Sequence, residues 1–236
     1  MTDAALTRAL DELADSAGNP SLLYVPFLGL FPVSGVAVST VGDLLGSETV
    51  SASDAIAARV DELQFDLGEG PCWDAMRSAR PVLEPDLRRN PRRVWPAFSA
   101  AIVELQVSSL FAFPLSIGPL RIGAVDLYAT EATDLTPAQT RQAAVMAEAA
   151  GRHVLRRALD ELGIHAEDTG NAYSRRLIHQ ATGMVLAQLQ IGAEDARLVI
   201  QGHAFAASRS MMDVAQDIVD RRLSFTRNDT GFEVSP

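Results

Sequence analysis

The sequence predicts an α+β domain built around an antiparallel sheet, followed by a separate all-α bundle of three helices. Short apolar strands alternate with helical segments up to about residue 128, and one long helical segment follows them. After a short polar linker, the last quarter of the chain contains three segments with apolar residues at helical spacing. The 236 residues are 47% hydrophobic and 6% aromatic, which is enough apolar material for two ordinary cores.

The first domain begins with a helix and two strands. Apolar residues three and four positions apart predict the first helix, and alternating valines among small residues predict the strands after it. Ser53 or Asp54 is suited to cap the next helix, because a short polar side chain accepts hydrogen bonds from the first free N–H groups. In order, we expect a helix over 6–17, strands over 36–41 and 49–52, and a helix over 54–65.

The remaining elements of this domain end in a long helix. A short helix over 72–77, a strand over 81–85, a helix over 95–105 and strands over 108–115 and 122–128 are expected. Thr136-Pro137 marks the start of a helix that runs to Leu162. Its apolar positions, interrupted by Arg152, suit a helix that packs partly on its own sheet and partly on a second copy of the chain. An ordinary amphipathic helix closing one domain is the alternative.

The bundle follows a linker over residues 163–171. We expect its helices over 172–190, 193–208 and 211–225, and a polar, frayed tail over 227–236. The predicted organisation is therefore a domain over 1–162, a linker, a bundle over 172–226 and a flexible tail.

Charge is distributed unevenly along the chain. The formal net charge is −10. Residues 1–165 contain 13 Arg against 21 Asp and Glu, a balance of −8, whereas residues 171–225 contain 6 Arg against 5 acidic residues, a balance of +1. The whole surface is therefore not suited to coat nucleic acid or an anionic membrane, although a local arginine face in the bundle can bind phosphates.

Several classes of protein are excluded by what the sequence lacks. The single cysteine, Cys72, permits no internal disulfide and no cysteine-based zinc cluster, and no metal site is expected. No lysine is present for amine chemistry. The longest apolar stretch, over 22–41, is interrupted by prolines and glycines, and no signal peptide is visible, so we expect a cytoplasmic protein without membrane association.

The first domain contains the stretch Gly68-Glu69-Gly70-Pro71-Cys72-Trp73-Asp74 and its flanks over 63–75, followed by Pro81-Val82, Asp86-Leu87, Trp95-Pro96, Phe113-Pro114-Leu115 and the strand 122–128. These motifs give it a resemblance to the GAF sensor domains of actinobacterial regulators. The resemblance implies a GAF-like sheet flanked by helices and a small-molecule or protein signal, with no cofactor and an unknown ligand.

The bundle contains the run Ile178-His179-Gln180-Ala181-Thr182-Gly183-Met184-Val185, then Asp195-Ala196, Ala204-Phe205-Ala206 and Asp213-Val214-Ala215. These motifs give it a resemblance to an ANTAR domain, a three-helix RNA-binding module of transcription antiterminators. The resemblance implies a homodimeric regulator that binds paired RNA hairpins in transcript leaders and prevents a terminator hairpin from forming. The order of the two domains implies that the sensor controls RNA binding.

Candidate RNA-binding residues cluster on the first helix of the bundle. Helical spacing places Arg175, His179 and Thr182 on one face, with Arg176 and Gln180 on its flank, whereas apolar neighbours such as Val185 look inward. These side chains offer donors to phosphates and to unstacked bases, and small residues let an RNA backbone approach. The full set is Arg175, Arg176, His179, Gln180, Ala181, Thr182, Gly183, Arg197, Arg209 and Ser210.

Each candidate also has a simpler interpretation. Surface arginines are most often a solvated helix face, and Gly183 has the alternative role of permitting close helix packing, since glycine inside a helix costs about 1 kcal/mol relative to alanine. Many ANTAR domains have a lysine where this chain has Thr182. The absence of this lysine removes one phosphate contact.

A ligand pocket in the first domain would be lined by aromatic residues and the single thiol. The candidates are equally suited to an ordinary core: Phe65, Cys72, Trp73, Trp95, Phe98, Phe111 and Phe113. Cys72 at the start of a predicted helix has a second interpretation as a redox-responsive thiol.

Two other functions remain open. A DNA-binding helix-turn-helix is one, although the third helix, with Asp213, Asp217 and Asp220, is too acidic to enter a groove. A redox sensor or enzyme using Cys72 is the other, but the chain has no second cysteine to resolve an oxidised thiol. No acid–base pair or nucleophilic triad is apparent, and we therefore expect a regulator rather than an enzyme.

Overall fold

The computed structural model describes residues 3–16, 19–41, 45–88, 95–118, 120–163, 176–228 and 231–235. The chain divides into two compact units, Met1–Tyr173 and Ser174–Pro236. The predicted linker over 163–171 lies outside the described residues except for Gly163, which ends a helix.

The first unit is built on a five-stranded antiparallel sheet, which confirms the predicted α+β class. Its strands follow the order β2-β1-β5-β4-β3. Hydrogen-bonded register places Val38 opposite Val125 and Phe111 opposite Leu127. The strands are β1 (Gly35–Thr40), β2 (Glu48–Ala52), β3 (Val82–Glu84), β4 (Ser109–Ile117) and β5 (Leu120–Ala129).

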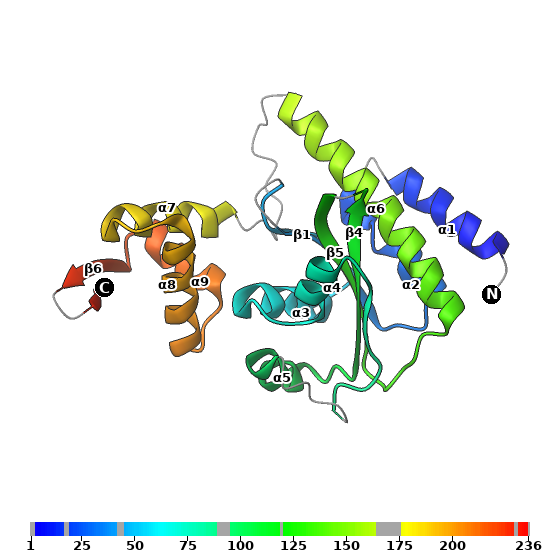
Figure 1. Cartoon of the computed structure of the whole chain (residues 1–236), viewed down its shortest axis with the longest axis horizontal. Coiled ribbons are helices and arrows are strands. Elements are labelled where there is room, and N and C mark those ends of the chain that lie inside the picture. Colours follow the sequence, from blue (N-terminus) through cyan, green and yellow to red (C-terminus); the bar gives the residue numbers. More distant parts are fainter. Residues whose placement is uncertain are drawn as a thin grey trace. The chain divides into compact units, whose positions relative to one another are not determined.

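Helices cover both faces of this sheet (Figure 1). On one face lie α1 (Asp3–Asp15), α2 (Val25–Leu30) and the long α6 (Pro137–Gly163), and on the other lie α3 (Ala55–Leu67), α4 (Pro71–Ser78) and α5 (Pro96–Ile102). Short 3-10 helices span Pro20–Leu22 and Val103–Leu105.

Each face of the sheet has its own apolar core, because successive side chains of a strand point to opposite faces. The core under α1 and α6 contains Phe111, Phe113 and Val125 from the sheet and Met146 and Ala150 from α6. The core under α3 and α5 joins strand residues to helix residues, namely Ala37, Leu110, Tyr128, Val60, Leu63, Trp95 and Phe98.

Local chemistry explains where the helices begin. Asp54 caps α3, its carboxylate accepting a hydrogen bond of 2.8 Å from the Ala57 N–H, as predicted. At the start of α6 the Thr136 N–H donates to the Gln139 side chain at 2.9 Å, and the Gln139 N–H donates to the Thr136 hydroxyl at 3.3 Å. This reciprocal pair stabilises the predicted helix start at Thr136-Pro137.

Gln64 connects α3, α4 and β5 through buried hydrogen bonds. Its amide nitrogen donates to Asp126 at 2.6 Å, and its amide oxygen accepts from the Cys72 N–H at 2.8 Å. The Trp73 indole donates to the Gln64 carbonyl at 2.6 Å. Burial raises the pKa of the Asp126 carboxyl well above its usual range, and the nearby Asp61 carboxylate raises it further.

The second unit contains three helices followed by a hairpin. The helices are α7 (Arg176–Leu189), α8 (Ala193–Ala206) and α9 (Met211–Val219), and the hairpin pairs β6 (Ser224–Asn228) with β7 (Gly231–Ser235). The all-helical bundle is confirmed. Its buried residues are Ile178, Ala181, Val185, Leu189, Ala196, Ile200, Ala204, Met211, Val214, Ala215, Ile218 and Phe225.

The end of this unit corrects the sequence prediction. The third helix was expected to reach Phe225, but it ends at Val219, and Arg221 adopts a left-handed backbone with φ of 59°. The segment predicted to be a frayed tail over 227–236 instead contributes strand residues to the hairpin, as Arg227 pairs with Phe232. The hairpin is anchored because the Phe225 N–H donates to the Gln188 side chain at 3.0 Å and the Phe225 ring is 2% exposed.

Candidate nucleic-acid interface

Helix α7 presents a polar, exposed face opposite its buried face. His179, Gln180 and Gly183 are exposed, whereas Ile178, Val185 and Leu189 are buried in the bundle core. The exposed side chains carry one imidazole and one amide, groups that donate and accept hydrogen bonds with bases and phosphates. The structure therefore brings three of the predicted residues together on one accessible surface, which we call the α7 face.

Open space lies above Gly183. A Cβ atom placed on this glycine would meet no atom within 4 Å outside its own helical turn. The packing of another described helix of this chain against Gly183 is therefore excluded as its reason. A ligand backbone can approach the helix closely at this point, because the glycine has no side chain to keep it away.

Two other members of the predicted set have structural roles. Ala181 is 0% exposed and packs in the bundle core, which removes it from the surface and corrects the prediction. Ala181 was selected for its small size, but it lies on the same helical stripe as the buried Ile178 and Val185. Thr182 is half-buried, and its hydroxyl donates a 2.7 Å hydrogen bond to the Ile178 carbonyl, so this donor is already used within the helix.

The arginines at the start of α7 are only partly described. Arg175 lies outside the described residues. Arg176 begins the helix, and nothing is described of its side chain. Their expected contact with phosphates stays a prediction.

The second and third patches differ from the α7 face. Arg197 is half-buried on α8. Ser210 caps α9, since its hydroxyl accepts a 3.1 Å hydrogen bond from the Asp213 N–H, which gives it a structural role at that turn. Arg209, in the α8–α9 connection, pairs with Asp217 of α9 at 2.7 Å.

Asp217 is the centre of an ion-pair cluster that the sequence did not reveal. It accepts from Arg209 and also from Arg222 at 2.8 Å, and Arg222 contacts Asp220 at 2.7 Å. The hydrogen bond from Arg209 lowers the pKa of Asp217 below its usual value, and the hydrogen bond from Arg222 lowers it further. An RNA phosphate that binds Arg209 must compete with this carboxylate.

The aromatic residues proposed to line a ligand pocket do not form one group. Phe111 and Phe113 lie in the core under α6, whereas Trp95 and Phe98 lie in the core on the other face of the sheet. Phe65 is also buried. The sheet separates the two pairs, so these side chains act as core residues.

Cys72 and Trp73 form a small cluster with Val41 and Ala124. Cys72 is 2% exposed at the start of α4, which shields its thiol from solvent. A buried apolar position favours a packing role over a redox-responsive one.

Neither a metal centre nor a membrane segment is found where the chain is described. Over those residues, no three His, Cys, Asp or Glu side chains are grouped to hold a metal ion. Within the same residues, no helix combines the length and hydropathy that a bilayer crossing needs.

Two family models match this chain. The GAF domain model matches residues 3–154, and the ANTAR domain model matches residues 171–219. The comparison with curated proteins gives no match.

Solved structures share the fold of the first unit at low sequence identity. The GAF domain from a phosphoenolpyruvate-protein phosphotransferase of Coxiella burnetii has a TM-score of 0.51 at 12% identity, covering 68% of this chain and 99% of its own. The corresponding GAF domain from Acinetobacter has a TM-score of 0.50 at 10% identity, covering 72% and 99%. The chromophore-binding domain of the bacteriophytochrome RpBphP3 from R. palustris has a TM-score of 0.50 at 10% identity, covering 68% and 62%.

Proposed function

This chain belongs to the GAF domain family and carries an ANTAR domain after it, and from this premise we propose that it binds RNA hairpins in transcript leaders and acts by antitermination. A GAF sensor joined to an RNA-binding ANTAR domain is a signal-responsive regulator, and neither domain is catalytic in kind. Beyond this class of regulator, we propose the RNA target and the mechanism. We also propose that the protein is a homodimer and that it binds nascent transcripts in the cytoplasm.

The observation that carries the proposal is the α7 face. It lies within the matched ANTAR segment and combines exposed polar side chains with unobstructed space at Gly183. Single-stranded loops expose base edges that side chains of this kind can recognise. Gln180 supplies an amide for a base edge, His179 supplies an imidazole for a phosphate or base, and Gly183 admits the RNA backbone.

Antitermination follows from hairpin binding in this scheme. A hairpin held by the protein keeps its strands from joining a competing terminator hairpin, and transcription continues. Two copies of the bundle in a dimer would hold two neighbouring hairpins. Exposed Val145 and Leu159 on α6, two heptads apart and 45% and 58% exposed, are the apolar positions that suit a helix–helix contact between copies.

Hairpin binding is tested by fluorescence anisotropy on the full chain at low ionic strength. Labelled stem-loops and a labelled DNA duplex are compared, because preference for the duplex would favour the DNA-binding alternative. Replacing His179 and Gln180 together by Ala should weaken hairpin binding about tenfold or more, which corresponds to the loss of two hydrogen bonds.

A matched control is available on another helix of the bundle. Gln216 is an exposed glutamine of α9 whose amide contacts Asp220 at 2.8 Å, away from the α7 face. Gln216→Ala should leave hairpin affinity unchanged. Equal effects of the two sets of substitutions would remove the α7 face from the RNA site.

A further inference from the structure

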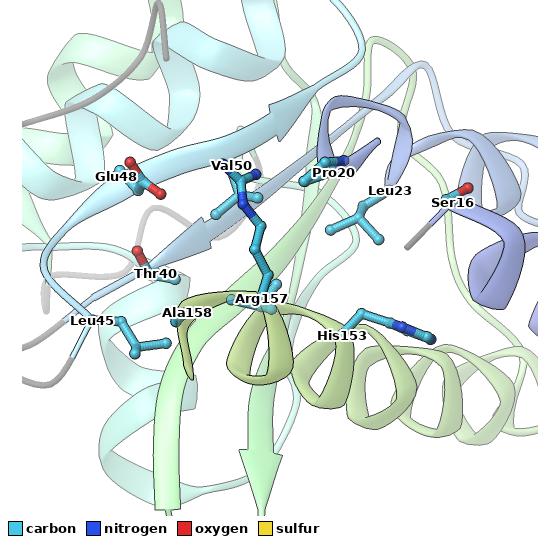
Figure 2. Close-up of a pocket in the computed structure, with 11 residues that line it drawn as sticks. Ser16, Pro20, Leu23, Thr40, Leu45, Glu48, Val50, His153, Arg157 and Ala158 are labelled. Atoms are coloured by element: carbon cyan, nitrogen blue, oxygen red, sulfur yellow. The ribbon is translucent and has the colours of Figure 1, made fainter. Parts of the chain in front are cut away.

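The first unit contains an open pocket on the α6 side of its sheet that no sequence pattern indicated. Figure 2 shows it between strands β1 and β2, the segment near Pro20 and the C-terminal half of α6. Its cavity volume is about 60 Å³, room for a few water molecules, and it is open to solvent on one side. Sites for drug-sized ligands commonly span roughly 300–1,000 Å³, so this pocket suits only a small ligand that stays partly in its open mouth.

The floor of the pocket is aliphatic. Leu23, Val50 and Val154 line it and are 1%, 7% and 6% exposed. Leu45 and Pro20 extend this apolar surface. No Phe, Tyr or Trp is among the described residues that line it. The floor favours a branched or linear aliphatic group.

Two buried polar atoms of the pocket walls have no hydrogen-bond partner within the described part of the chain. Thr40 is 2% exposed, and its hydroxyl oxygen is one of them. The Nδ1 atom of His153 is the other. A buried hydroxyl without a partner costs free energy, which a hydrogen bond from a ligand or a bound water would recover. Burial lowers the pKa of His153, and nearby Arg156 and Arg152 lower it further, which keeps its imidazole neutral near pH 7.

Side chains of opposite charge face the same pocket from its two walls. Arg157 extends from α6 toward strand β2, and Glu48 projects from β2 (Figure 2). A ligand with a carboxylate alone would be attracted by the guanidinium and repelled by the glutamate. A ligand that carries both a carboxylate and an ammonium group on one small framework would be attracted by both.

We propose that this pocket binds a free α-amino acid with an aliphatic side chain. The ligand's carboxylate pairs with Arg157 and hydrogen-bonds the Thr40 hydroxyl, its ammonium group pairs with Glu48, and its side chain packs on the aliphatic floor. The ligand would join β2 to α6, the helix that ends the sensor unit, and it is thus the input signal of the regulator. Only this last step depends on the proposed function.

Isothermal titration calorimetry on the full chain tests the site. Because no RNA is present, a failure of leucine binding is distinguishable from a failure of hairpin binding. The probes are L-leucine and 4-methylpentanoate, which has the same carbon chain without the ammonium group. L-leucine should bind saturably. The affinity for 4-methylpentanoate should be lower by a factor of about ten or more, because this probe leaves Glu48 unpaired. Absence of leucine binding up to millimolar concentration, or equal affinity for the two probes, would overturn the proposal.

Substitutions locate the binding. Arg157→Gln should weaken leucine binding about tenfold or more, and Thr40→Val, which keeps the shape of the side chain, should weaken it about threefold to tenfold. Arg156→Gln is the matched control, since Arg156 is the exposed neighbour on the same helix and does not line the pocket. Circular dichroism establishes that each variant is folded. Leucine binding that survives both pocket substitutions in folded protein would place the ligand elsewhere and overturn the assignment.

Discussion

Replacing Gly183 should change the stability of the second unit and the proposed RNA binding in opposite directions. It lies inside α7, where glycine is about 1 kcal/mol less favourable than alanine. A Cβ at this position would meet nothing within 4 Å outside its own helical turn, so Gly183→Ala introduces no clash. We therefore expect the substitution to stabilise the second unit by about 0.5–1 kcal/mol. For a domain of about 60–100 residues, each kcal/mol raises Tm by about 4–8 °C.

The same methyl group stands on the surface where an RNA backbone is proposed to approach. Hairpin binding should therefore weaken, by about tenfold if close approach at this position contributes about 1.4 kcal/mol. Urea or thermal unfolding followed by circular dichroism measures the stability, and fluorescence anisotropy with a labelled stem-loop measures the affinity.

Gly202 provides the matched control. It is an exposed glycine inside α8, and an added Cβ there also meets nothing within 4 Å. Gly202→Ala should stabilise the unit by a similar amount and leave hairpin affinity unchanged. Equal hairpin affinity for the Gly183→Ala variant and the unchanged protein would refute the inference that RNA approaches α7 at this glycine.

Three further predictions test the electrostatics and the packing. Asp126 has a raised pKa in the folded state, so the folded state holds its proton more strongly and the free energy of unfolding falls as pH rises above the unfolded-state pKa. Asp126→Asn keeps an acceptor for the Gln64 amide. In urea titrations it should raise the free energy of unfolding at neutral pH by about 1.4 kcal/mol for each unit of the pKa shift, and it should flatten the pH dependence of stability. A lower free energy of unfolding at pH 7 would contradict this. Asp217→Asn should free Arg209 from its ion pair. Hairpin binding should then strengthen a few-fold at low salt and depend more steeply on salt concentration. Unchanged anisotropy titrations would exclude Arg209 from the RNA site. Gly123→Ala should destabilise the first unit by about 3 kcal/mol or more, because the new Cβ would lie 1.8 Å from a backbone oxygen of β1, and a normal thermal transition would show that the two strands can move apart.

The sequence predicted the elements whose signals are local. The strands of the sheet and the start of α6 at Thr136-Pro137 were predicted because alternation and capping depend on a few adjacent residues. The short helix α2 was missed because Pro26 and Gly29 were taken only as interruptions of an apolar stretch, although proline is tolerated in a first helical turn. The closing hairpin was missed as well, because its residues were taken as a polar tail that lacks a packed partner.

The candidate sites depended on contacts that local patterns do not contain. Which face of the sheet receives Phe111 or Trp95 is set by strand register and helix placement, so the aromatic residues could not be divided between two cores from their spacing. The pairing of Arg209 with Asp217 joins residues separated by a turn. On α7, helical spacing did separate exposed His179 from buried Val185, but Ala181 was included for its small size and is buried.

Photocrosslinking tests the central claim most directly. The full chain is crosslinked to a stem-loop containing 4-thiouridine in the loop and digested with trypsin, which cleaves after Arg176 and after Arg197 and leaves the whole described α7 face in the peptide 177–197. Our account predicts that RNA is attached chiefly to this peptide and that an unlabelled hairpin prevents the attachment. Attachment only to peptides of the first unit, or equal attachment after competition, would contradict recognition of RNA by this helix.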